Sequence, residues 1–153
     1  DILSMLVFVG ALWGAIVFPV IVSLYWNRVT NLAFTTSVVA AFVAFLLTRF
    51  SVVPLEGFIG LATEFVACIG AGVVIGLMAF GLLGKRVGMV LGVIAMMVAL
   101  YLGLGGLREY PVLISSLLAY GVSAVVCTAI SLSTHKQFDF DLIGERVTNY
   151  QTA

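Results

Sequence analysis

Few side chains in this sequence could carry acid–base chemistry, and one of them lies inside an apolar stretch. Glu64 is about two helical turns into residues 57–83, or roughly 10 Å from Gly57 at a rise of 1.5 Å per residue. An ionisable side chain in lipid is costly, so an intramembrane carboxylate indicates a functional site. The other interpretation is that this long stretch extends beyond the membrane and that Glu64 lies at the outer interface. Arg49 and Arg108 are possible partners on the same side in both cases.

The other reactive residue types form no catalytic or metal-binding pattern. His135 is the only histidine, and it has no second ligand at metal-binding spacing, which favours a solvated side chain. Cys68 and Cys127 fall inside apolar stretches, which favours buried small hydrophobic residues over a disulfide or a metal pair. We therefore expect no catalytic residue, no metal ligand and no enzymatic activity in this chain.

Glycines recur four residues apart within and beside the apolar stretches, and they form no phosphate-binding loop. Small residues at this spacing let helix backbones approach closely in lipid, so we interpret these glycines first as positions where helices pack. The pairs are Gly10 and Gly14, Gly72 and Gly76, Gly84 and Gly88, and Gly88 and Gly92.

The first apolar stretch combines such glycines with an aromatic ring and a proline. Gly10, Trp13 and Gly14 bring a flat ring and bare backbone to one region. Pro19 has no N–H to donate to the Ala15 carbonyl, which frees that oxygen and favours a kink. For this region, a role other than helix packing is therefore also open.

The composition identifies an integral membrane protein. Of 153 residues, 63% are hydrophobic and 9% are charged, with a mean hydropathy of +1.25. Soluble domains carry roughly 25% charged residues. The formal net charge is zero, which removes any case for nucleic-acid binding. The partner that this composition indicates is the lipid bilayer.

Five apolar stretches are long enough to cross a bilayer, which takes about 20 residues. The short links between them predict an up-down array in which consecutive helices are antiparallel neighbours. The predicted fold class is therefore an all-α integral membrane protein with five transmembrane helices. The expected spans are residues 2–26, 31–50, 57–83, 87–104 and 111–132, within a transmembrane region over residues 1–132.

The basic residues predict the orientation of this array, because cytoplasmic loops carry an excess of Lys and Arg. We expect a multi-pass protein of the plasma or bacterial inner membrane, with its N-terminal end outside and its C-terminal tail in the cytoplasm. This orientation leaves Arg49 and Arg108 outside and places five cations inside: Arg28, Lys85, Arg86, Lys136 and Arg146.

The tail, residues 133–153, differs in character from the spans. Its apolar side chains alternate with charged ones, and from Asp141 onward the apolar positions partly fit one helical face. Two interpretations are open: a short helix on the membrane surface, and a tail that packs on cytoplasmic loops or is disordered.

The turn between the first two spans has a distinctive composition. A Gly-containing apolar stretch ends at Trp26, Arg28 follows in a short turn with Thr30 and Asn31, and the small residue Ala33 lies near the start of the next span. This pattern resembles the sodium:solute symporter family, whose members move sugars, proline, urea, carboxylates and similar small solutes.

Two positions depart from the family pattern. The family often has two basic residues after the Trp, whereas the first of these positions here is Asn27. The following helix usually opens with Gly-Ala or similar, whereas here it opens with Leu32-Ala33-Phe34.

The resemblance implies the leucine-transporter-type fold, in which inverted repeats move solute and sodium past a midplane site by alternating access. It identifies this chain as the C-terminal portion of a sodium-coupled symporter for a small organic solute. Residues 2–26 would be the last core helix and would line the outer part of the solute path, which makes Gly10, Trp13 and Gly14 candidate path residues. The sodium ion would be held by preceding core helices, and those helices would be partners of this chain.

Two other interpretations are open. The same symporter-like membrane module serves as the input domain of some sensor kinases, and soluble domains would then follow residue 153. A small accessory membrane subunit would instead start close to Asp1. The chain begins with Asp1 rather than Met and almost directly inside a span, which predicts a piece of a longer protein.

Overall fold

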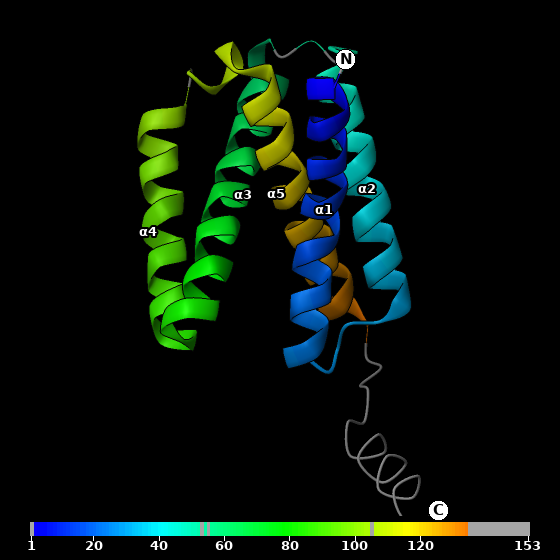
Figure 1. Ribbon diagram of the computed structural model, residues 1–153, viewed down its shortest axis with the longest axis vertical. Helices are drawn as coiled ribbons and strands as arrows, with labels where there is room; N and C mark the ends of the chain where they lie inside the picture. The colour runs from blue at the N-terminus through cyan, green and yellow to red at the C-terminus, as the bar shows by residue number, and fades with distance from the viewer. Residues whose placement is uncertain (1, 53, 55, 105, 135–153) are drawn as a thin grey trace, which may run out of the picture.

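The computed structural model describes residues 2–52, 54, 56–104 and 106–134, and these residues form helices joined by short turns (Figure 1). No strand occurs in this described part of the chain. The elements in chain order are α1 (Ile2–Tyr25), α2 (Asn31–Arg49), α3 (Gly57–Leu83), α4 (Lys85–Gly103), the 3₁₀ helix η1 (Leu107–Glu109) and α5 (Pro111–Ser133).

Each of the five α-helices is long and apolar enough to cross a membrane. The prediction of an all-α chain with five such helices is confirmed, and the architecture is consistent with a multi-pass membrane protein. The observed helix ends lie within two residues of the predicted ones. The interpretations of the tail from residue 135 onward fall outside the described residues.

Local chemistry explains where several helices begin and end. Thr30 Oγ1 accepts a hydrogen bond from the backbone N–H of Ala33 at 3.2 Å and caps the start of α2. Gly84 separates α3 from α4 with φ at +91°, a conformation that costs glycine little. Pro111 occupies the first turn of α5. A backbone N–H at this position has no acceptor within the helix, so proline, which lacks the N–H, costs no hydrogen bond here.

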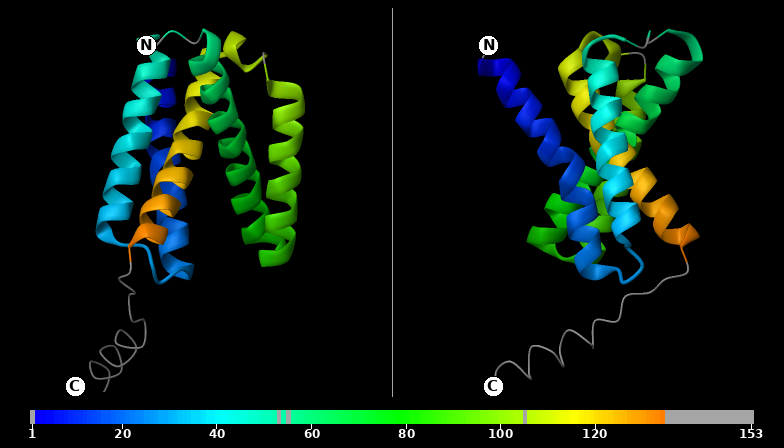
Figure 2. Two further views of the ribbon diagram at one scale, coloured as in Figure 1. Left: turned by 180° about the vertical axis from the view of Figure 1, so that it is seen from behind. Right: turned by 90° about the vertical axis from the view of Figure 1, so that its right-hand side faces the viewer.

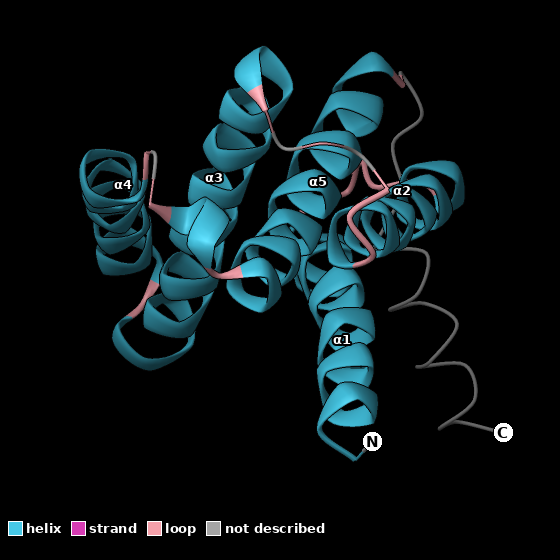
Figure 3. Cartoon of the chain, turned by 90° about the horizontal axis from the view of Figure 1, so that it is seen from above, coloured by secondary structure: helices cyan, strands magenta, loops and turns pink. Residues whose placement is uncertain are grey.

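The packing order differs from the order along the chain. Helix α5 lies in the middle of the bundle, against α1, α2 and α3, and α4 packs on α3 at the edge (Figures 1 and 3). Consecutive helices are antiparallel, as predicted. However, α2 does not pack along α3, and α4 does not pack along α5, so the prediction that consecutive helices are neighbours is wrong at these two links.

The length of the links allows this rearrangement. The link between α2 and α3 comprises residues 50–56. Such a segment can extend to at most about 23 Å. Packed helix axes lie about 8–10 Å apart, so the segment is long enough to pass over an intervening helix. A short link therefore fixes direction but leaves room for α5 between α2 and α3.

The interior is built mostly from small side chains, and most large apolar side chains point outward. Many Leu, Ile, Val, Met and Phe residues are more than a third exposed, which suits a surface that faces lipid. Two buried clusters form the core, one of Ala15, Ala41, Phe45 and Ala119 and the other of Ala67, Ile114 and Leu118.

Helix α1 crosses the bundle obliquely. Its C-terminal end lies close to the other helices, whereas its N-terminal end stands away from them (Figure 2, right). Among the α-helices it packs against α2 and α5. One contact between α1 and α2 is the edge-to-face pair of Phe8 and Phe42, whose ring centroids are 5.5 Å apart.

Candidate functional site

A carboxylate and a guanidinium form an ion pair at the end of the bundle where α1 begins. The Glu64 side chain on α3 is 1% exposed, and the Arg108 side chain on η1 is 34% exposed. Arg108 Nε donates to Glu64 Oε1 at 3.0 Å, and Nη2 donates to Oε2 at 3.2 Å. Two parallel charge-assisted hydrogen bonds make this the strong form of an Arg–carboxylate pair.

Two elements position the pair. Glu64 lies near the start of α3, on a buried face that continues through Ala67 and Cys68. Arg108 is the central residue of η1, the single turn that leads through Tyr110 into α5. The pair therefore ties the connection between α4 and α5 to the side of α3.

The structure selects between the two partners that the sequence allowed for Glu64. The carboxylate pairs with Arg108 and is buried within the protein. Removing either partner would leave a charge without its counter-ion in a desolvated site. The arrangement is suited to holding a loop in one place, and any movement of η1 away from α3 would have to separate the two charges.

A second polar contact crosses the bundle at the proline of α1. Pro19 lies inside the helix and cannot donate to the Ala15 carbonyl. That carbonyl accepts a hydrogen bond from Ser123 Oγ of α5 at 2.7 Å, in a buried setting. The sequence predicts the freed oxygen, and the fold supplies its donor from a helix more than a hundred positions away.

The three candidate path residues do not share one surface. Trp13 is 66% exposed, and a Cβ on Gly10 would have no described atom within 4 Å apart from its own stretch of helix. Gly14 faces the interior, where a Cβ would lie 2.8 Å from the Tyr120 ring of α5. Gly14 is thus a packing position between α1 and α5, and Gly10 and Trp13 face outward.

The described residues contain no group of three or more His, Cys, Asp or Glu side chains that could hold a metal ion. Cys68 on α3 and Cys127 on α5 are both buried and free of a disulfide. His135 lies outside the described residues. The chemistry that the described geometry offers is therefore ion pairing and helix-to-helix hydrogen bonding.

Sequence reasoning missed Ser123. A signal was available, because Ser115, Ser123 and Ser131 interrupt an otherwise apolar stretch. At 3.6 residues per turn each of them is rotated by about 80° from the one before, so the three serines lie on different sides of the helix. All three are fully buried. Small polar residues on several sides of an apolar helix indicate a helix that is surrounded by other helices, as α5 is by α1, α2 and α3.

The fold and these contacts define a helical bundle suited to a membrane, held together by small residues, the Glu64–Arg108 ion pair and polar contacts between helices such as that of Ser123 with Ala15. Comparisons with protein families, with curated proteins and with solved structures find no match to this chain. A functional assignment therefore rests on its residues and their geometry.

Proposed function

We propose that this chain is the C-terminal part of a sodium-coupled symporter that moves a small organic solute by alternating access. The observation that carries the proposal is the turn between α1 and α2, where Trp26, Arg28 and Thr30 stand between two helices that could cross a membrane. These residues also carry the resemblance to the sodium:solute symporter family.

The geometry of this turn gives structural roles to its residues. Thr30 caps α2 through the backbone N–H of Ala33, which gives the Thr of the pattern a structural role. Tyr25 packs edge-to-face on Phe80 of α3, with ring centroids 5.1 Å apart. An aromatic residue at a helix end also suits the membrane–water boundary.

The exposure of α1 gives further support. The helix carries a free aromatic ring at Trp13 and open backbone at Gly10 on its outward side. In the proposed transporter the preceding core helices would cover this side of α1. Gly10 and Trp13 would then lie at the boundary with those helices, where a solute path would run.

The test is sodium-driven uptake by the full-length protein in liposomes. The panel of radiolabelled solutes comprises a sugar, proline, urea and a monocarboxylate. We expect one class to accumulate against its gradient only when sodium flows inward. Replacing Trp13 by Ala should lower uptake several-fold, whereas Tyr101→Ala on α4, which is 89% exposed, should leave it unchanged.

Two results would contradict the proposal. One is a folded full-length protein that neither takes up these solutes nor exchanges radioactive sodium across the liposome membrane. The other is a coding sequence without core helices before residue 1. A kinase domain encoded after residue 153 would favour the sensor interpretation instead.

A further inference from the structure

We propose that an apolar groove between α1 and the α3–α4 hairpin binds one acyl chain of an anionic phospholipid, with the lipid phosphate at Arg28, Lys85 and Arg86. The inference goes beyond the proposed transport function and does not depend on it. It rests on the shape of the groove, its length, its opening and the charges at one end.

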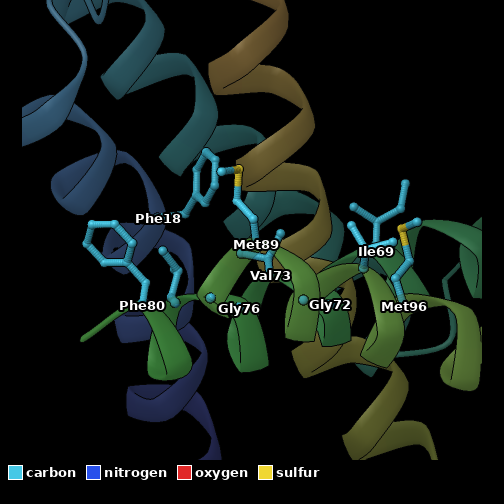
Figure 4. A pocket seen from close by; sticks show the side chains of 12 residues that line it. Phe18, Ile69, Gly72, Val73, Gly76, Phe80, Met89 and Met96 are labelled. Carbon is cyan, nitrogen blue, oxygen red and sulfur yellow. The ribbon is translucent and has the colours of Figure 1, made fainter. Parts of the chain in front are cut away.

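The groove has a volume of about 300 Å³ and an almost entirely apolar lining. Its floor is the line of contact between α3 and α4, and Phe18 of α1 forms the facing wall. The side chains of Phe18 and Met89 point toward each other across it (Figure 4). This volume is at the lower end of that of small-molecule sites, about 300–1,000 Å³, and suits a slender ligand.

Glycines keep the floor bare. A Cβ on Gly92 would lie 3.0 Å from the Gly76 Cα, and a Cβ on Gly72 would lie 2.8 Å from the Gly92 carbonyl oxygen. The two backbones are therefore already in contact, so α3 and α4 cannot move closer to fill the space beside them. A hollow lined by large flexible side chains remains along that contact.

The length of the groove matches one leaflet of a bilayer. Phe80 lines one end and Ile69 the other (Figure 4). The rise along α3 from Ile69 to Phe80 is about 16 Å at 1.5 Å per residue, whereas the hydrocarbon core of a bilayer is about 30 Å thick. An acyl chain that enters from the α3–α4 turn would therefore occupy the groove down to about the midplane.

The groove is open on its outer side. Met89 and Val93, which line it, are 60% and 57% exposed. In a membrane this opening faces the acyl chains of the surrounding lipid. A lipid chain can enter laterally without any rearrangement of the bundle.

The charges select an anionic headgroup. Lys85 and Arg86 begin α4 at the mouth of the groove, and both are exposed. Arg28 follows α1 at the same end of the bundle. The contact between Tyr25 and Phe80 brings this end of α1 next to the end of α3.

The described carboxylates, Glu56, Glu64 and Glu109, lie at the opposite end, beside the start of α3 and in η1. A phosphate at the mouth would meet cations without a competing carboxylate in the described residues.

The experiment uses the full-length protein in phosphatidylcholine nanodiscs that contain a small fraction of phosphatidylglycerol with a photoreactive group on its acyl chain. After illumination, cross-linked peptides are identified by mass spectrometry. We expect cross-links to concentrate on the groove faces of α1, α3 and α4. Unlabelled phosphatidylglycerol should compete at least fivefold better than phosphatidylcholine.

Two matched variants separate the groove from the general lipid surface. Val93→Trp fills the groove from its open side and should lower groove cross-linking about tenfold. Ile94→Trp adds the same side chain at the next position of α4, which is 51% exposed and outside the groove lining, and should leave cross-linking unchanged. The double change Lys85→Gln and Arg86→Gln should remove the preference for phosphatidylglycerol but keep the cross-links.

Three outcomes would overturn the proposal. Cross-links spread evenly around the bundle would show ordinary boundary lipid. Equal competition by phosphatidylcholine would reject the anionic headgroup. A groove without cross-links in a folded protein would show that a protein segment, such as another helix or a second copy, fills it.

Discussion

Helices α4 and α5 have nearly the same mean hydropathy, yet they occupy opposite positions in the bundle. Helix α5 has nine buried residues and lies in the centre, whereas α4 has one, Gly88, and lies at the edge. The buried positions of α5 are mostly Ser, Ala, Gly and Cys, and α4 presents Met, Val, Ile and Leu outward. Lipid tails are as apolar as Leu, so hydropathy cannot sort helices inside a membrane, and small residues decide which helix is buried.

The two helices also differ in the kind of contact that holds them. α5 donates the hydrogen bond from Ser123 to the Ala15 carbonyl of α1, and it follows directly on the turn that carries Arg108. Both helices contact α3 through glycines that bring two backbones together, so the polar contacts are what distinguishes α5. If this comparison is correct, substitutions around α5 should cost much more than equivalent substitutions on α4.

The largest effect is expected where α3 and α5 cross. A Cβ on Gly70 would overlap the Leu117 carbonyl oxygen, and backbone cannot yield as a side chain can. Gly70→Leu should therefore abolish the monodisperse folded peak in size-exclusion chromatography of a fluorescent fusion. Gly81→Leu, on the same helix, meets no atom within 4 Å and serves as the control. A normal peak for Gly70→Leu would mean that the helices do not cross this closely.

The ion pair gives the next largest effect. Arg108→Gln leaves the Glu64 carboxylate buried without its guanidinium, which should cost about 3 kcal/mol, a low value for a buried pair because Arg108 is partly exposed. Unfolding by sodium dodecyl sulfate in mixed micelles measures this loss. The double variant Glu64→Gln with Arg108→Gln should recover most of it, because no charge is then left alone. Equal losses in the single and double variants would argue against the pair.

Glu64→Gln by itself addresses function as well as stability. If the buried pair is coupled to transport, this substitution should lower uptake by the full-length protein. Unchanged uptake together with unchanged expression would remove Glu64 from the functional residues.

A direct comparison of α5 and α4 uses one residue type on each helix. Ile114 on α5 is fully buried, and Ile94 on α4 is 51% exposed. Ile114→Ala should destabilise the protein by about 2 kcal/mol, through lost contacts and a cavity. Ile94→Ala should change stability by less than about 0.5 kcal/mol. Similar losses at both positions would show that α4 is covered by something other than lipid.

The smallest effect is expected at the hydrogen bond between α5 and α1. Ser123→Ala leaves the Ala15 carbonyl without this donor in a buried setting and should cost about 1 kcal/mol. Ser116→Ala, where the hydroxyl bonds within its own helix, should cost less. The same micelle titration compares the two variants, and a larger loss for Ser116→Ala would reverse the ranking.

The five helices, their ends and their alternating direction follow from local features of the sequence. Long apolar stretches, Pro111 and the Thr30 cap act locally, so no knowledge of neighbouring helices was needed. The sequence also predicted that Pro19 would free the Ala15 carbonyl, because that effect arises within one turn of one helix.

The tertiary structure alone decided which helices are neighbours. The placement of α5 between α2 and α3, the choice of Arg108 over Arg49 as the partner of Glu64, and the donation from Ser123 to Ala15 all join residues that are far apart in the chain. Apolar periodicity carries little information about these contacts, because every face of a membrane helix is apolar whether it meets lipid or protein. Backbone fit at small residues and the pairing of the few polar groups supply that information, and both exist only once the helices have packed.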